Sequence, residues 1–242
     1  MKILLLGAKG QLGQTFLAHG GLAMRGDVRA ASRDGKLSSG SAGVIGDLAD
    51  HAGLLALLDH EQPDIIVNAA AYTAVDKAET DEDVATLVNG QALEIIGTWA
   101  AAHDTLVIHY STDYVFAGAA SAPYPPTAST DPQGAYGRSK LAGENLLRAS
   151  GARHMIFRTA WVYSAVGHNF LRTMLRLGSE RDELRVVADQ RGTPTSTSLI
   201  VEGTLVALDA YQAAGASAAA LTGTYHLTAS GETTWHGFAE AI

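Results

Sequence analysis

A tyrosine and a lysine four residues apart, Tyr136 and Lys140, occur in the segment GAYGRSK, just after a loop. A phenol with a pKa of about 10 is a poor acid at neutral pH unless a nearby cation stabilises the phenolate. On a helix, this spacing puts both side chains on one face, so that Lys140 can supply the cation. The pair therefore predicts a proton-transfer centre. The alternative is an ordinary helix start that happens to contain both residue types.

Hydroxyl and carboxyl side chains gather in the preceding segment, HYSTDYVF. Thr112 and Asp113 come at the end of a predicted strand, and ligands of open α/β sheets bind beyond the carboxyl ends of the strands. The Thr112 hydroxyl could hold a substrate carbonyl beside the Tyr136 phenol, while Lys140 could also bind a cofactor ribose. These residues predict a carbonyl-reduction site, with a hydride from a nicotinamide and a proton from Tyr136.

A glycine-rich turn lies near the N-terminus, where GAKGQLG places Gly7, Gly10 and Gly13 between a predicted strand and a predicted helix. Residues without a Cβ allow a tight turn and a close approach to phosphate, and a helix N-terminus favours the pyrophosphate charge. The spacing is G-x-x-G-x-x-G rather than the usual G-x-G-x-x-G. Glycines that merely end a strand are the alternative, but the strand–turn–helix context favours dinucleotide binding.

Two later strand ends are further candidates for cofactor contacts. Asp47 and Leu48 follow the short predicted strand VIG and could reach the adenine ring. The small side chains of Ala69, Ala70 and Ala71 follow IIVN and would let the cofactor lie against the strand end. For each segment, plain packing is an equal alternative.

The second predicted strand bears on the choice of cofactor. Its end presents Ser32 and Arg33 before any acidic residue. A hydroxyl and a guanidinium suit a 2′-phosphate, which arginine can bind through two parallel bonds. Alternatively, the Asp34 carboxylate turns inward and accepts a hydrogen bond from the ribose 2′-hydroxyl, as an acidic residue does in enzymes that select NAD. We expect NADPH as the cofactor, with NADH possible.

Apolar runs of strand length alternate with longer helical patterns along the chain. Continuous runs such as IIVNAA suit strands buried on both faces, and the alternation predicts βαβ units with a parallel sheet. We therefore expect an α/β fold with a Rossmann-type doubly wound sheet. The expected strands are 2–6, 27–31, 64–68, 105–110 and 154–158, and the expected helices are 11–19, 50–60, 83–103 and 136–150.

The rhythm becomes less regular after about Trp161. We expect residues 1–160 to form a dinucleotide-binding Rossmann domain. Residues 161–242 should be mostly a small C-terminal substrate-binding lobe, interleaved with the sheet. Because the chain stops inside a predicted amphipathic helix that begins near Thr233, we expect the lobe to be truncated.

Composition limits the classes of protein. The 242 residues are 47% hydrophobic and 17% charged, as in a globular protein. A net charge of −8 argues against a nucleic-acid partner. The chain has no cysteine, which excludes disulfides and thiolate chemistry and fits a reducing cytosol. The apolar run in MKILLLGAKG is too short for a signal peptide or a membrane span. We expect a cytoplasmic protein without a membrane partner.

The motifs GxxGxxG, NAAAYTAVDKAE, STDYVF, YGRSK, RTAWVY and DQRGTPT occur in this order. Over nearly its whole length, the chain resembles the extended short-chain dehydrogenase/reductase family. Within that family it is most similar to the enzymes of the last step of dTDP-L-rhamnose synthesis. The resemblance implies NAD(P)H-dependent reduction of dTDP-4-dehydro-6-deoxy-L-mannose at C4.

The resemblance also implies roles for individual residues. It makes Thr112, Tyr136 and Lys140 a catalytic triad, and it makes Thr112, Asp113 and Trp161 contacts of the sugar nucleotide. For Trp161, which follows the strand MIFRT, burial in the core is a serious alternative. The implied cofactor contacts are Gln11, Leu12, Asp47, Leu48, Ala71, Tyr72, Thr73, Tyr110, Tyr136 and Lys140.

Several features carry no functional assignment. The loop before YGRSK reads PYPPT, where the family usually has an acidic residue after a Pro-aromatic pair. Family members have been described with magnesium at a subunit contact, but no residue here identifies such a site, so we assign no metal ligand. The acidic run 79–84 is expected to be a solvated helix start. The nine histidines show no ligand spacing, and His109 is expected to be a buried strand residue.

Two other functions remain open. One is another nucleotide-sugar reductase, or an epimerase or dehydratase of the same fold, the latter two recycling the cofactor within each turnover. The other is a non-catalytic regulatory subunit that binds a dinucleotide. The presence of Thr112, Tyr136 and Lys140 argues against a pure binding module, although Lys140 could serve ribose binding alone. We expect a monomer or a homodimer that binds a nucleotide sugar.

Overall fold

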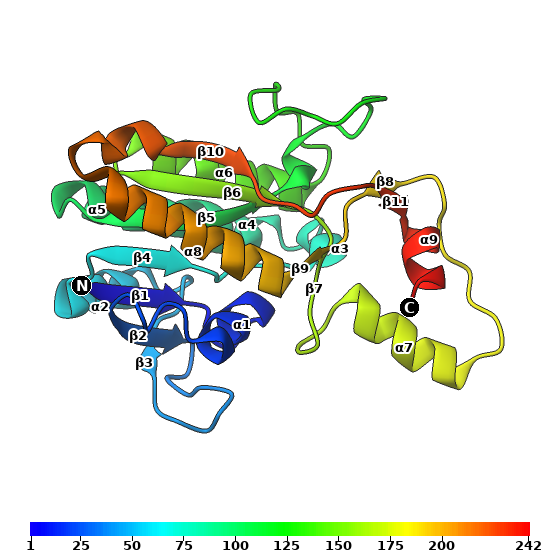
Figure 1. The fold of residues 1–242 in the computed structure, drawn as a ribbon, viewed down its shortest axis with the longest axis horizontal. Coiled ribbons are helices and arrows are strands. Elements are labelled where there is room, and N and C mark those ends of the chain that lie inside the picture. The colour runs from blue at the N-terminus through cyan, green and yellow to red at the C-terminus, as the bar shows by residue number, and fades with distance from the viewer.

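The computed structural model describes residues 1–242, and its central layer is a seven-stranded sheet of order β10-β6-β5-β4-β1-β2-β3 (Figure 1). All neighbouring strands run parallel. The strand order reverses between β1 and β4, which is where such sheets bind dinucleotides. The strands are β1 (Lys2–Leu6), β2 (Asp27–Ser32), β3 (Val44–Ile45), β4 (Ile65–Asn68), β5 (Leu106–Thr112), β6 (His154–Thr159) and β10 (Gly223–His226).

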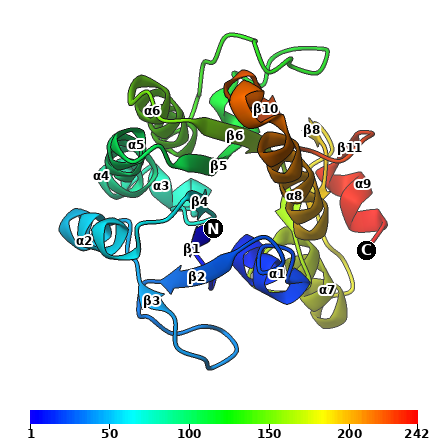
Figure 2. The same cartoon turned by 60° about the vertical axis from the view of Figure 1, so that its left-hand side comes forward.

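Helices cover both faces of this sheet, as Figure 2 shows end-on. One face carries α1 (Gln11–His19) and α8 (Thr197–Ala214). The other carries α2 (His51–Glu61), α5 (Ala92–Ala102) and α6 (Ala135–Ala149). The Rossmann-type doubly wound fold expected from the sequence is confirmed.

The apolar strands follow from this two-sided burial. In β1, Ile3 and Leu5 pack into the core beneath α1 and α8, whereas Leu4 and Leu6 pack into the core on the opposite face. All four side chains are fully buried. Because successive side chains of a strand point to opposite faces, a strand covered on both sides needs an unbroken apolar run.

The single helix expected over 83–103 is interrupted in the structure. It divides into α4 (Glu82–Thr86), a π-helical turn η1 (Leu87–Gln91) and α5. The buried Asn89 side chain lies in this turn and bonds to the backbone N–H and C=O of Tyr72. Hydrophobic periodicity could not predict the break, because a contact between distant segments accompanies it.

The residues after Trp161 divide between the sheet layer and a lobe. Helix α8 and strand β10 return to the sheet, while the lobe lies beyond the carboxyl ends of the strands (Figure 1). None of the helices is long and apolar enough to cross a membrane. The lobe comprises β7 (Val162–Tyr163), α7 (Phe170–Glu180), β8 (Arg191–Gly192), β9 (Thr195–Ser196), β11 (Thr233–Thr234) and α9 (Trp235–Glu240), and η3 (Gly215–Leu221) follows α8.

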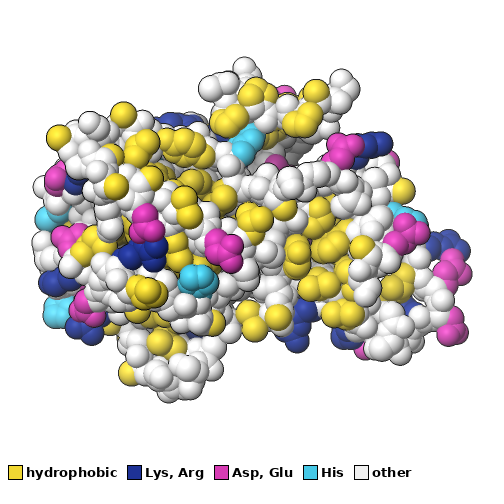
Figure 3. All heavy atoms as spheres, in the orientation of Figure 1, with side chains coloured by type: hydrophobic (Ala, Val, Ile, Leu, Met, Phe, Trp, Pro, Cys, Tyr) yellow, Lys and Arg dark blue, Asp and Glu magenta, His cyan; other side chains and the backbone are white.

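Aromatic packing holds the lobe together. Trp161 stacks on Trp235 with ring centroids 3.6 Å apart. Phe170 contacts both Trp235 and Phe238, at 4.5 Å and 5.4 Å between centroids. Figure 3 shows hydrophobic side chains gathered over this part of the molecule.

A buried ion pair joins the sheet to α6. The Arg158 guanidinium of β6 donates to both carboxylate oxygens of Glu144, at 2.9 Å and 2.6 Å. It also donates to the carbonyl of Pro126 in the loop before α6, at 3.0 Å. Burial alone would raise the pKa of Glu144, but its hydrogen bonds, chiefly that from Arg158, lower it below its usual value. The pair fixes β6, α6 and this loop relative to one another.

Arg158→Met should destabilise the fold by about 3–5 kcal/mol, because it leaves the Glu144 carboxylate buried without its main partner. Urea unfolding measures the loss. Arg176→Met is the control, since it removes an exposed pair with Glu180 and should cost less than about 1 kcal/mol. Similar losses in the two variants would contradict the assigned role of the buried pair.

Candidate active site

The glycine turn after β1 lies against the end of β4. Gly7 has φ +80°, and a Cβ there would lie 2.6 Å from the backbone nitrogen of Ala70. A Cβ at Gly13 would overlap the carbonyl oxygen of Gly7, so α1 lies directly on the turn. At Gly10 a Cβ would lie 3.2 Å from the same oxygen, which is tight but less crowded. Packing within the fold thus requires glycine at the first and third positions.

The start of α1 fits a bound pyrophosphate. Gly10 is its N-cap, no side chain caps it, and its first turn contains no acidic residue. The first backbone N–H groups of a helix have no intrahelical acceptor, and the helix dipole adds positive potential there. These groups are available to an anion, which is what a dinucleotide presents at this point of a doubly wound sheet.

The side chain of Gln11 joins α1 to the lobe. Its amide donates to the His168 carbonyl at 3.1 Å and accepts from Ser164 and Asn169, at 3.0 Å and 2.8 Å. Leu12 packs against the core beneath α1. These bonds use one of the two N–H groups of the amide, and a cofactor contact of Gln11 stays a prediction.

Charged residues meet at the end of β2. Ser32 is buried, and its hydroxyl oxygen lies 2.7 Å from the Lys36 carbonyl oxygen and 3.1 Å from Asp34 Oδ1, either of which can accept its one hydrogen. Asp34 pairs at 2.8 Å with Lys9 of the glycine turn, and this bond is the main cause that lowers the pKa of Asp34 to about 2. Arg33 is exposed. Our sequence reasoning did not identify Lys9, although the basic residue in GAKG was its visible signal.

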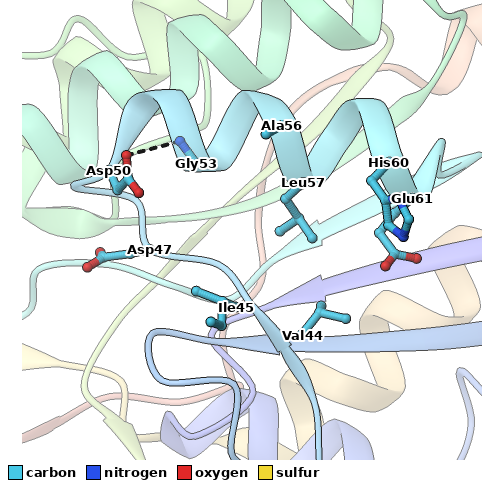
Figure 4. Close-up of a pocket in the computed structure, with 9 residues that line it drawn as sticks. All are labelled: Val44, Ile45, Asp47, Asp50, Gly53, Ala56, Leu57, His60 and Glu61. Carbon is cyan, nitrogen blue, oxygen red and sulfur yellow. Dashed lines mark hydrogen bonds between the residues drawn. The ribbon is translucent and has the colours of Figure 1, made fainter.

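A hollow between β3 and α2 contains only one residue of the predicted site. Asp47 lines it, and the Asp47 carboxylate accepts from the backbone of Ala49 at 3.0 Å. Figure 4 shows the hollow, with the Asp50 side chain bonded to the backbone of Gly53 at the start of α2. Leu48 is buried in the core and does not line it. This hollow lies at the edge of the sheet. None of the residues at the ends of β4 and β5, described next, lines it.

The segment after β4, Ala69 to Thr73, has a backbone fixed by Asn89. The Asn89 amide accepts from the N–H of Tyr72 at 2.9 Å and donates to its C=O at 3.0 Å. The same amide donates to the Ser139 hydroxyl of α6 at 3.0 Å. Ala69, Ala70, Ala71 and Tyr72 are partly exposed, and Thr73 is exposed. Asn89, which sequence reasoning missed, thus couples the proposed cofactor segment to α6.

Helix α6 lies very close to two neighbouring turns. A Cβ at Gly137 would overlap the carbonyl oxygen of Tyr114, in the 3-10 turn η2 (Asp113–Val115). A Cβ at Gly143 would overlap the carbonyl oxygen of Asn89 in η1. These two glycines bring α6 against the end of β5, and α6 carries the tyrosine–lysine pair.

Acidic residues fix the start of the same helix. Glu79 accepts from the backbone N–H of Ala135 at 2.9 Å, at the N-terminus of α6. Glu82 accepts from the Arg138 guanidinium at 2.8 Å and 3.0 Å. The expectation of a merely solvated helix start over 79–84 was therefore incomplete. A carboxylate at a helix N-terminus satisfies a free N–H and complements the helix dipole.

The side chains of Thr112 and Tyr136 lie close together at the end of β5. Thr112 donates to Asp113 at 3.0 Å and accepts from the backbone of Tyr114 at 3.2 Å. The Tyr136 ring packs edge-on against Tyr114, with centroids 5.8 Å apart. Burial and the Asp113 carboxylate raise the pKa of Tyr136, and a hydrogen bond with Thr112 opposes the shift. The phenol therefore keeps its proton at neutral pH.

Lys140 lies behind this pair and is 2% exposed. Its Nζ donates to the Tyr110 carbonyl at 2.7 Å and lies 3.2 Å from Nε2 of His109. Burial lowers the pKa of Lys140 to about 8, against the effect of Glu144. An effect of Lys140 on the pKa of Tyr136 stays a prediction. In this structure its Nζ contacts groups of β5.

The side chains of Tyr110 and Trp161 are already engaged in contacts within the protein. The Tyr110 hydroxyl bonds to Thr204 at 2.9 Å inside the core beneath α8, so only its carbonyl faces Lys140. Trp161 has φ 47°, and Trp235 covers one face of its partly exposed indole. A Cβ on Gly192 would overlap the same indole. Its contact with a sugar nucleotide stays a prediction.

No group of three or more His, Asp and Glu side chains could hold a metal ion. The other features of the site point to a single class of protein. The doubly wound sheet, the uncapped α1 terminus and the hydroxyl pair beside a buried lysine define an NAD(P)-dependent oxidoreductase of the short-chain dehydrogenase/reductase class.

Comparison with known proteins refines this class. The family model described as "RmlD substrate binding domain" matches residues 1–242, and the chain belongs to this family. It is 45% identical over 242 residues to the dTDP-4-dehydrorhamnose reductase of Burkholderia thailandensis, covering 100% of this chain and 77% of the relative. The same enzyme of Escherichia coli K12 is 42% identical over 245 residues, with the same two coverages.

Solved structures agree. The dTDP-4-dehydrorhamnose reductase of Clostridium acetobutylicum superposes with a TM-score of 0.87 at 34% identity, covering 99% of this chain and 78% of that one. The Bacillus anthracis enzyme, solved in complex with NADP, gives a TM-score of 0.85 at 29% identity, with coverages of 99% and 79%.

Gly13→Ala should weaken dinucleotide binding roughly ten- to hundredfold, because the new methyl pushes α1 off the turn and loosens its contacts with the phosphates. Fluorescence titration with NADPH measures the change. Gly178→Ala is the matched control, since this helical glycine in α7 has nothing within 4 Å of its Cβ position. If both variants bind NADPH like the wild type, the α1 terminus is not the phosphate site.

Proposed function

We propose that this chain catalyses the NADPH-dependent reduction of the C4 keto group of dTDP-4-dehydro-6-deoxy-L-mannose, giving dTDP-L-rhamnose. The observation that carries the proposal is the placement of Thr112 and Tyr136 together at the end of β5, with the buried Lys140 one turn further along α6. The full-length match to dTDP-4-dehydrorhamnose reductases supports the choice of substrate.

In this mechanism, NADPH supplies the hydride that is added to C4 of the sugar. The Thr112 hydroxyl and the Tyr136 phenol hold the keto oxygen, and the Tyr136 proton passes to this oxygen as negative charge develops on it. The raised pKa keeps the phenol fully protonated before the reaction but also makes it a weaker acid. The transfer stays favourable because the alkoxide that forms is a stronger base than the phenolate. In the structure the Thr112 hydroxyl gives its one hydrogen to Asp113, whose own pKa burial raises, so it turns from Asp113 to the keto oxygen when the sugar binds.

We assign the cofactor to the edge formed by the ends of β1, β2 and β4. The N-terminus of α1 would bind the pyrophosphate, and the segment from Ala69 to Thr73 would lie along the nicotinamide half. Arg33 would bind the 2′-phosphate. The Lys9–Asp34 pair supports NADPH, because it occupies the carboxylate that would otherwise accept from a free ribose hydroxyl. The NADP complex of the Bacillus anthracis relative supports the same choice.

The assay that tests this function combines the purified chain with the 4-keto nucleotide sugar and NADPH. We expect a substrate-dependent loss of NADPH absorbance and dTDP-L-rhamnose as the product. An epimerase or dehydratase would convert the sugar without net loss of NADPH, and a regulatory subunit would convert nothing. Either result would contradict the proposal.

We also infer that the reaction takes place in the cytoplasm, which supplies reduced nicotinamide, and that the chain acts as a monomer or a homodimer. The absence of cysteine supports a reducing compartment, and the net charge of −8 argues against a nucleic-acid partner.

Tyr136→Phe should fold and bind NADPH but lose about 10²–10⁴-fold in kcat, the usual contribution of a positioned acid. Steady-state kinetics with the keto sugar measure the loss. Tyr225→Phe is the control, because it deletes an exposed hydroxyl that donates only to the Leu221 carbonyl. A kcat of Tyr136→Phe close to that of the control would remove the proton donor from the mechanism.

Arg33→Ala should weaken NADPH binding roughly ten- to hundredfold and leave NADH binding nearly unchanged, because one charge-assisted contact with the 2′-phosphate is lost. Titration with each cofactor measures the two affinities. Arg185→Ala, in the exposed loop after α7, controls for the loss of one positive charge. Equal effects on NADPH and NADH would show that Arg33 does not bind the phosphate.

A further inference from the structure

Three polar side chains are enclosed between β4, β5 and α6. Asn68, His109 and Lys140 are 1%, 0% and 2% exposed. The Asn68 amide nitrogen lies 3.2 Å from His109 Nδ1, and His109 Nε2 lies 3.2 Å from Lys140 Nζ. A chain of buried nitrogens is satisfied only if each contact has one donor and one acceptor, so the proton positions are constrained.

The orientation of the Asn68 amide fixes the first proton position. Its oxygen accepts from the backbone N–H of Ala70 at 3.1 Å, so its NH₂ group faces His109. An amide NH₂ only donates, and His109 Nδ1 must therefore accept. Burial holds the pKa of His109 well below its usual value, so the ring is neutral. A neutral ring that accepts at Nδ1 carries its hydrogen on Nε2.

The Nε2–H group of His109 then points at Lys140 Nζ. An ammonium group has only donors, and a second donor facing it is unfavourable. A neutral amine has a lone pair, so it can accept from His109 while it donates to the Tyr110 carbonyl at 2.7 Å. The enclosed geometry therefore complements the neutral form of the lysine.

We propose that Asn68 and His109 are positioning residues that present an N–H group to Lys140 and thereby favour its neutral amine over its ammonium form. Glu144 and Tyr136, which flank Lys140 on α6, also bear on its protonation. Glu144, one turn further along α6, favours the ammonium, although Arg158 of β6 and Arg148 share its charge. Tyr136, one turn before it, is neutral. Burial is the largest influence and lowers the pKa of Lys140 to about 8.

This role has a consequence for catalysis, which rests on the function proposed above. After Tyr136 gives its proton to the sugar oxygen, the phenolate must regain one. Lys140 in its ammonium form can donate that proton, becoming a neutral amine that solvent reprotonates afterwards. A lysine that titrates just above neutrality gives up its proton more readily than one with an ordinary pKa, and Asn68 and His109 keep it in that range.

The tautomer of His109 tests the proposal without any assay of activity. A long-range proton–nitrogen correlation spectrum of the ¹⁵N-labelled protein, recorded at about pH 9 where the amine is neutral, distinguishes the two ring nitrogens. The loss of one signal in His109→Gln assigns it. We expect the hydrogen on Nε2. A hydrogen on Nδ1 would overturn the proposal.

Asn68→Asp tests the coupling to Lys140. A carboxylate only accepts, so His109 must donate from Nδ1 and present its Nε2 lone pair to the ammonium. Lys140 acts as an ammonium, so kcat/KM is full below its pKa and falls as pH rises through it. The variant should move this basic limb upward by about one pH unit, the equivalent of one hydrogen bond. If the basic limb of the variant's pH profile coincides with that of the wild type, the coupling of Asn68 to Lys140 is wrong.

The added negative charge of Asn68→Asp also raises the lysine pKa directly, so a double variant supplies the control. In Asn68→Asp with His109→Phe, the direct charge effect remains, while the route through the imidazole is lost. We expect a clearly smaller upward shift relative to His109→Phe alone. An equal shift would overturn the role of His109. If the wild type reduces no keto sugar, the proposed function fails, but the tautomer still decides the hydrogen-bond assignment.

Discussion

The site depends on a close contact between α6 and the backbone at the end of β5. Gly137 and Gly143 leave no Cβ between α6 and the carbonyl groups of η2 and η1, and larger residues there would lift the helix away. Because Tyr136 and Lys140 are one turn apart on α6, this contact sets the position of both relative to Thr112. Glu79 then fixes the start of the helix, and the Arg158–Glu144 pair holds it further along.

Burial of charge follows from the same contact. Pressing α6 onto the sheet removes the Lys140 amine and the Glu144 carboxylate from water, which costs free energy unless partners replace the lost hydration. Arg158 compensates Glu144 directly. Lys140 has only the Tyr110 carbonyl and the neutral His109 ring, so its pKa falls to about 8. The raised pKa of Tyr136 has the same origin, and together these shifts give a protonated phenol in front of a lysine that titrates near neutrality.

Much of the fold could be predicted because it follows from local patterns. The unbroken apolar runs predicted the first sheet strands, and the bounds of β1 and α1 agree with those expected. The predicted family and reductase function are confirmed, and both predictions rested on the order of the sequence motifs.

The single helix expected over 83–103 was wrong, because a π-helical turn interrupts it where Asn89 contacts Tyr72. Lys9, Asn89 and Glu79 were missed as site residues because each acts through a partner 17 or more positions away, as Asn89 does on Tyr72, and sequence patterns do not show such pairings. The individual roles of the site residues stay predictions.

The fate of a deuterium label tests the central claim most directly, namely that this edge of the sheet transfers a hydride from a nicotinamide to the sugar. The purified chain is given the 4-keto nucleotide sugar and NADPH deuterated at the transferred position, and the product is examined by NMR. We expect deuterium bound to C4 of the product sugar and oxidised cofactor in equal amount. A converted sugar that contains no deuterium, with the label still on the cofactor, would contradict it.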